Sequence, residues 1–378
     1  MRRLLLIWCV GLAALLLALM LSVRLRYGGG RPYPDMSTAP LIPDNQLHTV
    51  VTFDEPIGNV AVSKSGRLFF TVHPESRPTG AKLLEWTGGR AIPFPDRHTQ
   101  DELFQTPLGV VIDRSDRLWV IDHGNHGFQK VRLVAFDVAT GDLVHDHVFD
   151  RAVAPRGSFF QDLQVDPTRD VVYIADVGFW ARRPALVVYE PGSGQARRVL
   201  DRHPSVFPQD WIIETADGPL VFFGGLAALK PGVDGVAISP DGDWLYYGAM
   251  THDGLYRVRT ADLFDTTLSD VELGDRVERF SDKPLNDGLS ADVEGNVYIT
   301  DVEHGAVMRV GPDRGLETLV KSPRIRWADA LSFGPNGWLY VADSALPDQV
   351  LRSKRHIREA GPYFIFRFRP GVEGVPGH

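Results

Sequence analysis

Short apolar runs recur along the chain, each followed by a turn and then by a second run rich in β-branched and aromatic residues. In the stretch from Asn286 to Val310, the first run is Leu289 to Ala291, the turn contains Gly295, and the second run is Val297 to Thr300. Runs of this length bounded by Asp and Gly predict β-strands joined by tight turns. The stretch therefore predicts consecutive strands of one antiparallel sheet.

The same unit occurs six times. The first core residues of the six units are Val60, Val110, Leu163, Val236, Leu289 and Leu331, which by subtraction lie 42 to 73 residues apart. Strand–turn–strand repeats with periods in this range indicate a β-propeller in which each repeat forms one four-stranded blade. We therefore expect an all-β fold, a six-bladed β-propeller.

The two ends of the repeat predict how the ring closes. The last unit supplies strands at Leu331, at Trp338 and from Tyr363 to Phe368, and the Pro/Gly-rich tail offers no fourth strand. A strand without a partner, His48 to Phe53, precedes the first unit. We expect it to complete the last blade, because closure leaves no open sheet edge.

The remaining segments divide the chain further. We expect a signal anchor or signal peptide over residues 1–27, a linker over 28–47, the propeller over 48–370 and a tail over 371–378. Leu4 to Val23 carries no charge, is long enough to cross a bilayer and has no clear cleavage site. This favours an anchor that holds an exported propeller on the periplasmic or extracellular face of the membrane. If the leader is cleaved, the propeller is secreted.

Two insertions interrupt the repeats, Asp201 to Gly232 before the fourth unit and Ser344 to Pro362 within the last. The second insertion contains the basic run VLRSKRHIREAG. It is either a solvated surface loop or a lid over the central opening, since long loops in compact folds are often functional.

Composition narrows the chemistry. The net charge of −8 disfavours nucleic acid as a partner, because binding nucleic acid requires a basic patch. The single cysteine, Cys9, lies in the leader, so the predicted propeller has neither disulfides nor a cysteine zinc site. The sequence has no G-x-S-x-G motif and no phosphate-binding loop, which leaves acyl-serine and nucleotide chemistry without support.

In a propeller, the residues just before each innermost strand and those just after the second strand lie on one face. Those of the first kind that converge on the central channel are Gln161, Asp234, Asn286, Asp287 and Asp329. Such a ring of oxygen ligands suits a hard cation, with Asp287 and Asp234 as candidate calcium ligands. Without a cation, crowded carboxylates raise one another's pKa and share a proton. Alternatively, each Asp-Gly pair simply begins an inner strand.

The residues after the second strands are His73, Asp122, Asp176, Asp301 and Asp343. We expect these aspartates to accept hydrogen bonds from backbone N–H groups of the following turn. His252 and His304 occupy equivalent loop positions. They are candidate catalytic bases or ligands on the channel face, or else ordinary exposed histidines.

Five stretches together resemble the major royal jelly/yellow protein family, in order along the chain from about Val50 to Pro370. They are PLGVVIDRSDRLWVIDHG, FQDLQVDPTRDVVYIADVG, DGVAISPDGDWLYYGAM, NDGLSADVEGNVYITDVEHGAV and WADALSFGPNGWLYVADSALP. More distantly, the chain is similar to the gluconolactonase/paraoxonase superfamily of six-bladed propellers. Because the propeller lacks cysteines, it looks like a bacterial-type member rather than an insect one.

The resemblance implies a secreted propeller that binds a small organic ligand in its central channel, with dopachrome conversion linked to some members. The calcium lactonases imply a metal position at Asp287 and place Asn-Gly where Asp234 stands. They also place a glutamate where this chain has Ile57 and Gly58, which weighs against calcium-dependent lactone hydrolysis.

Four functions follow as hypotheses. The first is binding of a small, aromatic or amine-bearing ligand at the channel mouth through Asp234, Asn286, Asp287 and Asp329, because carboxylates pair well with amines. The second is a calcium-dependent lactonase or esterase with His252 or His304 as base. The third is a tautomerase that uses His304 to shuttle a proton. The fourth is a protein-interaction platform built on the basic insertion.

Overall fold

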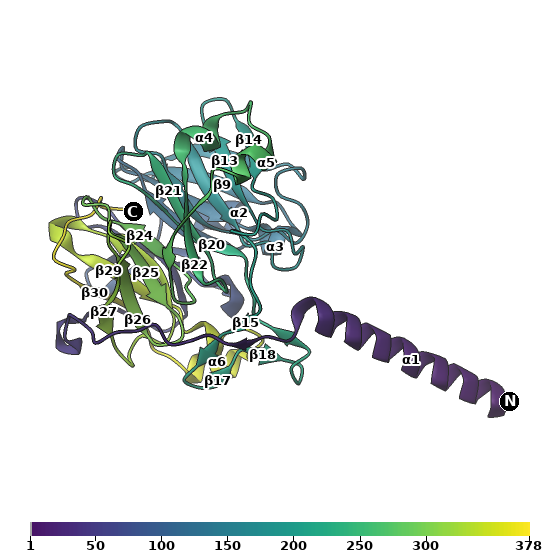
Figure 1. Ribbon diagram of the computed structural model, residues 1–378. Coiled ribbons are helices and arrows are strands. Elements are labelled where there is room, and N and C mark those ends of the chain that lie inside the picture. Colours follow the sequence, from purple (N-terminus) through teal and green to yellow (C-terminus); the bar gives the residue numbers. More distant parts are fainter. Residues whose placement is uncertain (1) are drawn as a thin grey trace.

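Six four-stranded β-sheets form a ring. One long helix leads away from it (Figure 1). The computed structural model describes residues 2–378. Each of these sheets is antiparallel and has four strands. The innermost strand of each sheet lies beside the innermost strand of the next sheet around the ring. The predicted six-bladed β-propeller is therefore confirmed.

From the channel outward, the first three blades are β3 (Ile57–Val62), β4 (Leu68–Val72), β5 (Leu83–Thr87) and β6 (Arg90–Pro93); β7 (Pro107–Ile112), β8 (Arg117–Asp122), β9 (Arg132–Asp137) and β10 (Leu143–Val148); and β11 (Phe160–Val165), β12 (Val172–Asp176), β13 (Ala185–Glu190) and β14 (Gln195–Val199). The last three are β20 (Val233–Ile238), β21 (Trp244–Ala249), β22 (Gly254–Arg259) and β23 (Glu278–Asp282); β24 (Leu289–Ala291), β25 (Val297–Asp301), β26 (Ala306–Val310) and β27 (Leu316–Lys321); and β28 (Ala328–Phe333), β29 (Leu339–Asp343), β30 (Tyr363–Phe368) and β2 (His48–Phe53).

The last blade closes the ring as the sequence predicted. β2 pairs antiparallel with β30, from His48 opposite Arg367 to Phe53 opposite Tyr363. The outer strand of the sixth blade therefore comes from the beginning of the repeat region, which ties the two ends of the ring together without an open edge between them.

Apolar side chains fill the spaces between neighbouring blades. Most inner and second strands are buried along their whole length, and between blades two and three Trp119, Phe160 and Ile174 are fully buried in one cluster. The inner strands also approach closely at the channel. A Cβ on Gly235 or Gly288 would lie 2.5 or 2.6 Å from a carbonyl oxygen of the next inner strand, so the Asp-Gly pairs satisfy a packing requirement.

The remaining elements lie outside the six blades. The helices are α1 (Arg2–Tyr27), α2 (Arg97–Leu103), α3 (Gly124–Gly127), α4 (Thr260–Phe264), α5 (Asp270–Gly274) and α6 (Lys354–Glu359). The 3-10 turns are η1 (Asp44–Gln46), η2 (Pro74–Ser76), η3 (Pro335–Gly337) and η4 (Leu346–Asp348). Three two-stranded pairs are β1 (Arg31–Pro32) with β15 (Trp211–Ile212), β16 (Glu214–Thr215) with β17 (Gly218–Pro219), and β18 (Val221–Phe222) with β19 (Ala227–Ala228).

The segments on either side of the repeats also pack on the propeller. Leu41 and Ile42 donate backbone hydrogen bonds to Thr318 and Leu319 of β27. At the other end of the chain, His378 is buried in the channel, where its Nδ1 lies 2.7 Å from Gln164 Oε1. Within α1, Leu5–Tyr27 is long and apolar enough to cross a membrane, with a mean hydropathy of 2.6, and fits a signal sequence or an anchor.

Candidate functional site

A cavity of about 290 Å³ lies at one end of the central channel. Its polar lining residues are His73, Glu75, His126, Gln161, Asp234 and Asp287. Its apolar walls include Tyr27 of α1, Phe159, Phe179, Trp180, Met250, Phe222 and Phe223 of the first insertion, and Leu346, Val350 and Leu351 of the second. Both insertions therefore roof the cavity, as a lid would.

Asp234 lies on the cavity lining, and its whole carboxylate lacks a hydrogen-bond partner among the described residues. It lies in the inner strand β20 and is only 1% exposed, and neither carboxylate oxygen has a hydrogen-bond partner among residues 2–378. Burial raises its pKa well above the usual range, and the charges of Asp287 and Asp329 raise it further. A buried carboxylate without partners is costly, so a ligand that donates to Asp234 would gain binding energy there.

Asp287 lies one blade further round and is fully satisfied by the protein. Gln161 Nε2 donates to one carboxylate oxygen over 2.8 Å and the indole N–H of Trp327 donates to the other over 2.7 Å. Burial raises its pKa to about 8, although these two hydrogen bonds act in the opposite direction. Gln161 and Asp287, both predicted to face the channel, therefore contact each other and stabilise the cavity wall beside Asp234.

Asp329 and Asn286 lie deeper in the wall. Asp329 Oδ2 lies 3.6 Å from His73 Nε2, and burial followed by the charge of Asp287 raises the pKa of Asp329 well above its usual value. The amide of Asn286 donates to the backbone carbonyl of Asp287 over 2.9 Å. Burial lowers the pKa of His73 to about 4, so this imidazole is neutral at physiological pH.

A histidine–glutamate pair completes the polar lining. His126 Nε2 lies 2.9 Å from Glu75 Oε1, and the imidazole stacks on Phe159 with ring centroids 4.7 Å apart. Burial opposes ionisation of Glu75, but the hydrogen bond and the charge of His126 outweigh it and lower the pKa of Glu75. The pair thus places one oriented imidazole in the cavity wall.

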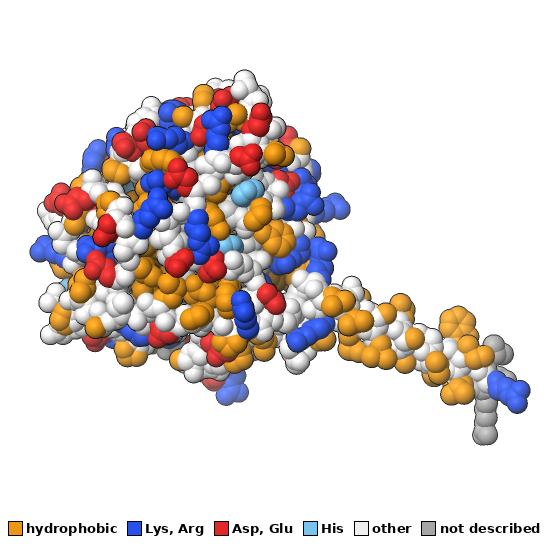
Figure 2. Space-filling view, in the orientation of Figure 1, with side chains coloured by type: hydrophobic (Ala, Val, Ile, Leu, Met, Phe, Trp, Pro, Cys, Tyr) orange, Lys and Arg blue, Asp and Glu red, His pale blue; other side chains and the backbone are white. Residues whose placement is uncertain are grey.

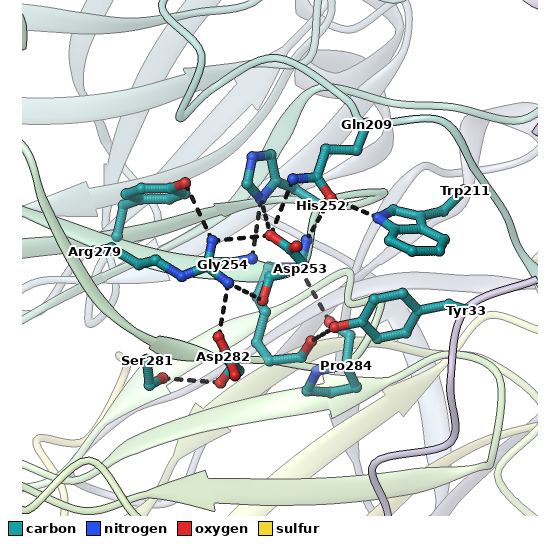
Figure 3. Close-up of polar contacts among 12 residues, drawn as sticks. Tyr33, Gln209, Trp211, His252, Asp253, Gly254, Arg279, Ser281, Asp282 and Pro284 are labelled. Carbon is teal, nitrogen blue, oxygen red and sulfur yellow. Dashed lines mark hydrogen bonds and ion pairs between the residues drawn. The ribbon is translucent and has the colours of Figure 1, made fainter.

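The two histidines predicted as catalytic line no part of this cavity. His252 lies in a polar network with Asp253, Arg279 and Gln209 (Figure 3), and its Nδ1 accepts from the backbone N–H of Gly254 over 2.9 Å. Burial, together with the charges of Lys283 and Arg279, lowers its pKa to about 4.

His304 forms an ion pair with Asp301, with Nδ1 2.9 Å from a carboxylate oxygen, and this hydrogen bond raises its pKa. The cavity instead receives its imidazoles from His73 and His126, in the first two blades.

The aspartates at the ends of the second strands hold backbone N–H groups, as predicted. Asp122 accepts from Gln105, Thr106 and Gly124, and Asp343 accepts from Arg326 and Trp327. Asp176 and Asp301 do the same. Their partners include residues that lead into the inner strand as well as residues of the following turn.

The channel residues do not fit a resident calcium ion. Among residues 2–378, the one group of three acidic or histidine side chains with ligand atoms within 4.8 Å of one another is Asp35, Asp301 and His304, away from the cavity. Both oxygens of Asp287 already face N–H donors, and Gly58 contributes no side chain to the first inner strand. Calcium prefers six to eight oxygen ligands.

The repeat pattern contained a signal for His73, which the sequence analysis placed after a second strand without assigning it to the site. Four blades end their second strand with Asp, whereas His73 stands at this position in the first blade. Glu75 and His126 follow the second strands of the first and second blades, but they belong to irregular turns. The insertions that roof the cavity lie outside the repeated units. The repeat pattern therefore could not predict that they lie over the channel.

Comparison with known proteins confirms the resemblance to the major royal jelly protein family. The family model "Major royal jelly protein" matches residues 105–321, more than half of the chain. Major royal jelly protein 2 of Apis mellifera is 28% identical over 190 residues, which cover 46% of this chain and 40% of that protein. Major royal jelly protein 3 of the same organism is 26% identical over 183 residues, 44% of this chain and 32% of that protein. The chain thus matches less than half the length of these curated relatives.

Solved structures show the same architecture. A gluconolactonase from Xanthomonas campestris superposes with a TM-score of 0.55 at 15% identity, covering 90% of this chain and 97% of the other. Regucalcin from Agrobacterium tumefaciens, described as a calcium-binding protein, gives a TM-score of 0.51 at 17% identity, covering 87% and 96%. At these identities the likeness shows the fold alone.

Proposed function

We propose that the propeller of this chain, which belongs to the major royal jelly protein family, binds a small organic molecule that carries a basic nitrogen. The ligand lies in the cavity at the channel mouth. The observation that carries this proposal is Asp234, a buried carboxylate without a protein partner on the lining of an aromatic cavity.

The charge balance of the channel favours a cation. Three other acids act on Asp234 through their charge: Asp287, Asp329 and Asp162. The cation that acts on it is Lys283. Burial lowers the pKa of Lys283 to about 7, and its Nζ donates to the backbone carbonyl of Pro284 over 3.1 Å. Without a ligand, Asp234 avoids an uncompensated charge by keeping its proton, because burial and the neighbouring acids raise its pKa. A protonated amine from the ligand would supply a second cation and a charge-assisted hydrogen bond.

The walls favour an apolar, ring-bearing ligand. Phe159, Phe179, Trp180 and Phe222 provide aromatic faces, which attract both rings and ammonium groups. The volume of about 290 Å³ is at the lower end of ordinary ligand sites, which span about 300–1,000 Å³. An aromatic amine with one or two fused rings matches this size and chemistry.

The proposal is tested with tryptamine and tryptophol, which differ in an amine against a hydroxyl group. Isothermal titration should show tighter binding of tryptamine by about 10- to 100-fold, since a hydrogen bond to a charged group contributes about 1.5–3 kcal/mol. Asp234→Asn should remove most of this preference.

Asp162→Asn is the matched control for this experiment. Asp162 lies in the neighbouring inner strand β11, and its two oxygens already accept from the backbone N–H groups of Leu163 and Val236. The control variant should keep the preference for tryptamine. Equal affinity of the wild-type protein for the two compounds would contradict the proposal.

The Glu75–His126 pair favours one catalytic alternative, an acid–base reaction on a bound lactone or an oxidised catechol. Nδ1 of His126 is buried and has no hydrogen-bond partner among residues 2–378. If a chelator leaves turnover intact and His126→Gln abolishes it, this metal-free reaction, and not ligand binding alone, is the function of the cavity. Turnover that requires calcium would support the lactonase hypothesis with Asp287 and Asp234 as ligands.

A further inference from the structure

Large apolar side chains surround the cavity mouth and project into solvent. Trp180, Phe223 and Leu351 are 50%, 71% and 64% exposed, and all three also line the cavity. They come from three separate segments: the loop after β12, the turn between β18 and β19, and the loop before α6. We call these three residues the apolar rim. Scattered exposed apolar residues are common, but a cluster of them around one opening marks an interaction surface.

The apolar helix α1 ends on this rim. The hydroxyl of Tyr27 donates to the backbone carbonyl of Trp180 over 3.1 Å, and Arg26 donates to that of Ala181 over 3.3 Å. Arg24 donates to the backbone carbonyl of Gly225, in the turn that also carries Phe223. Lys230 donates to the carbonyl of Gly28 over 2.9 Å, so no free linker separates the helix from the propeller.

The same side of the molecule carries a basic segment. Arg352, Lys354, Arg355 and Arg358 are exposed directly after Leu351, although the whole chain has a net charge of −8. Figure 1 places α6 and β18 on the side of the propeller from which α1 departs, and Figure 2 shows the continuous apolar surface of α1 beyond it. Basic residues beside an apolar surface suit anionic lipid headgroups.

We propose that the apolar rim lies in the interface of a lipid bilayer that α1 spans, so that the cavity mouth faces the membrane. A bilayer that contains Leu5–Tyr27 has to reach the rim, because Tyr27 contacts Trp180 directly. Aromatic side chains are favoured at the level of the headgroups, where Trp180 and Phe223 would lie. The lipid bilayer is the proposed partner whatever molecule the cavity binds.

The test measures the depth of the rim in a membrane. Full-length protein in a Cys9→Ser background carries Phe223→Cys or Leu351→Cys, labelled with bimane, in vesicles of phosphatidylcholine and phosphatidylglycerol. We expect brominated lipids to quench the fluorescence at both rim positions well beyond that at a solvent-exposed control position, because interfacial apolar groups reach about 5–10 Å into the headgroup and acyl boundary. Val271→Cys is the matched control, since Val271 is 75% exposed and belongs to α5, an element that lies away from α1 (Figure 1).

The control position should show no quenching. Quenching at both rim positions that is no stronger than at Val271→Cys overturns the proposal. So does an intact mass of the membrane-extracted protein that lacks residues 1–27, because the rim would then have no span beside it. Two rim variants are used so that misfolding of one leaves the comparison intact.

Discussion

Asp234 lies in the inner strand β20 and Asp287 lies just before the next inner strand, β24, but the two aspartates differ in what surrounds their oxygens. Trp327 and Gln161 satisfy Asp287, whereas Asp234 has no partner among residues 2–378. Natural proteins retain such destabilising groups mainly at functional sites. We therefore interpret Asp287 as a support and Asp234 as the ligand contact.

This difference predicts how stability depends on pH. Burial holds the pKa of Asp234 far above the value of about 3.9 that an aspartate has in the unfolded chain. The folded state binds the proton more tightly, so the group favours folding at low pH and this contribution is lost as pH rises above about 4. Asp234→Asn breaks no hydrogen bond of the described chain. The melting temperature of the variant relative to wild type should therefore rise between pH 5 and pH 8.

Thermal unfolding of both proteins across this pH range, without ligand, measures the effect. A gain of about 2 °C corresponds to about 1 kcal/mol for a large domain. Asp162→Asn is the comparison, because burial raises the pKa of Asp162 to about 7. Its melting temperature relative to wild type should also rise from pH 5 but level off near pH 7, and it should lie below that of Asp234→Asn because the change weakens two backbone hydrogen bonds. A constant difference between wild type and Asp234→Asn across the range would contradict the assigned environment of Asp234.

At the scale of elements, the repeat made the propeller predictable and the insertions did not. Each repeat must bury its apolar faces against its neighbours, so the spacing of Val60, Val110 and the later core residues determined the number of blades and the closing strand. The channel position of Asp234 and Asp287 followed from the same geometry. The first insertion folds as small β-pairs over the opening. The local periodicity of its sequence does not indicate this arrangement.

The roof can be tested separately from the charged contact. Phe222 of β18 lies in the cavity wall, so Phe222→Ala should weaken tryptamine and tryptophol by a similar factor of about ten, since a buried aromatic contact contributes about 1–2 kcal/mol. The preference between the two compounds should remain. Phe264→Ala in α4, where the side chain is 41% exposed, is the control. A loss confined to tryptamine would indicate that Phe222 acts through the ammonium group instead.

At the scale of the whole molecule, the two insertions and the end of α1 meet on one side of the ring (Figure 1), and residues of all three line the cavity. The sequence predicted the apolar leader and the propeller as separate segments. It did not indicate that Tyr27 would contribute to the cavity wall, because this contact joins residues more than 150 positions apart. The leader is therefore part of the site as well as a candidate membrane segment.

The central claim is that Asp234 receives the cationic group of an aromatic ligand. A crystal structure of the protein with tryptamine tests it most directly. We predict the ammonium nitrogen about 2.7–2.9 Å from an oxygen of Asp234, the range of charge-assisted hydrogen bonds, with the indole ring between Phe159 and Phe222. An ammonium group that points to solvent, or a ligand bound outside the cavity, would contradict the account.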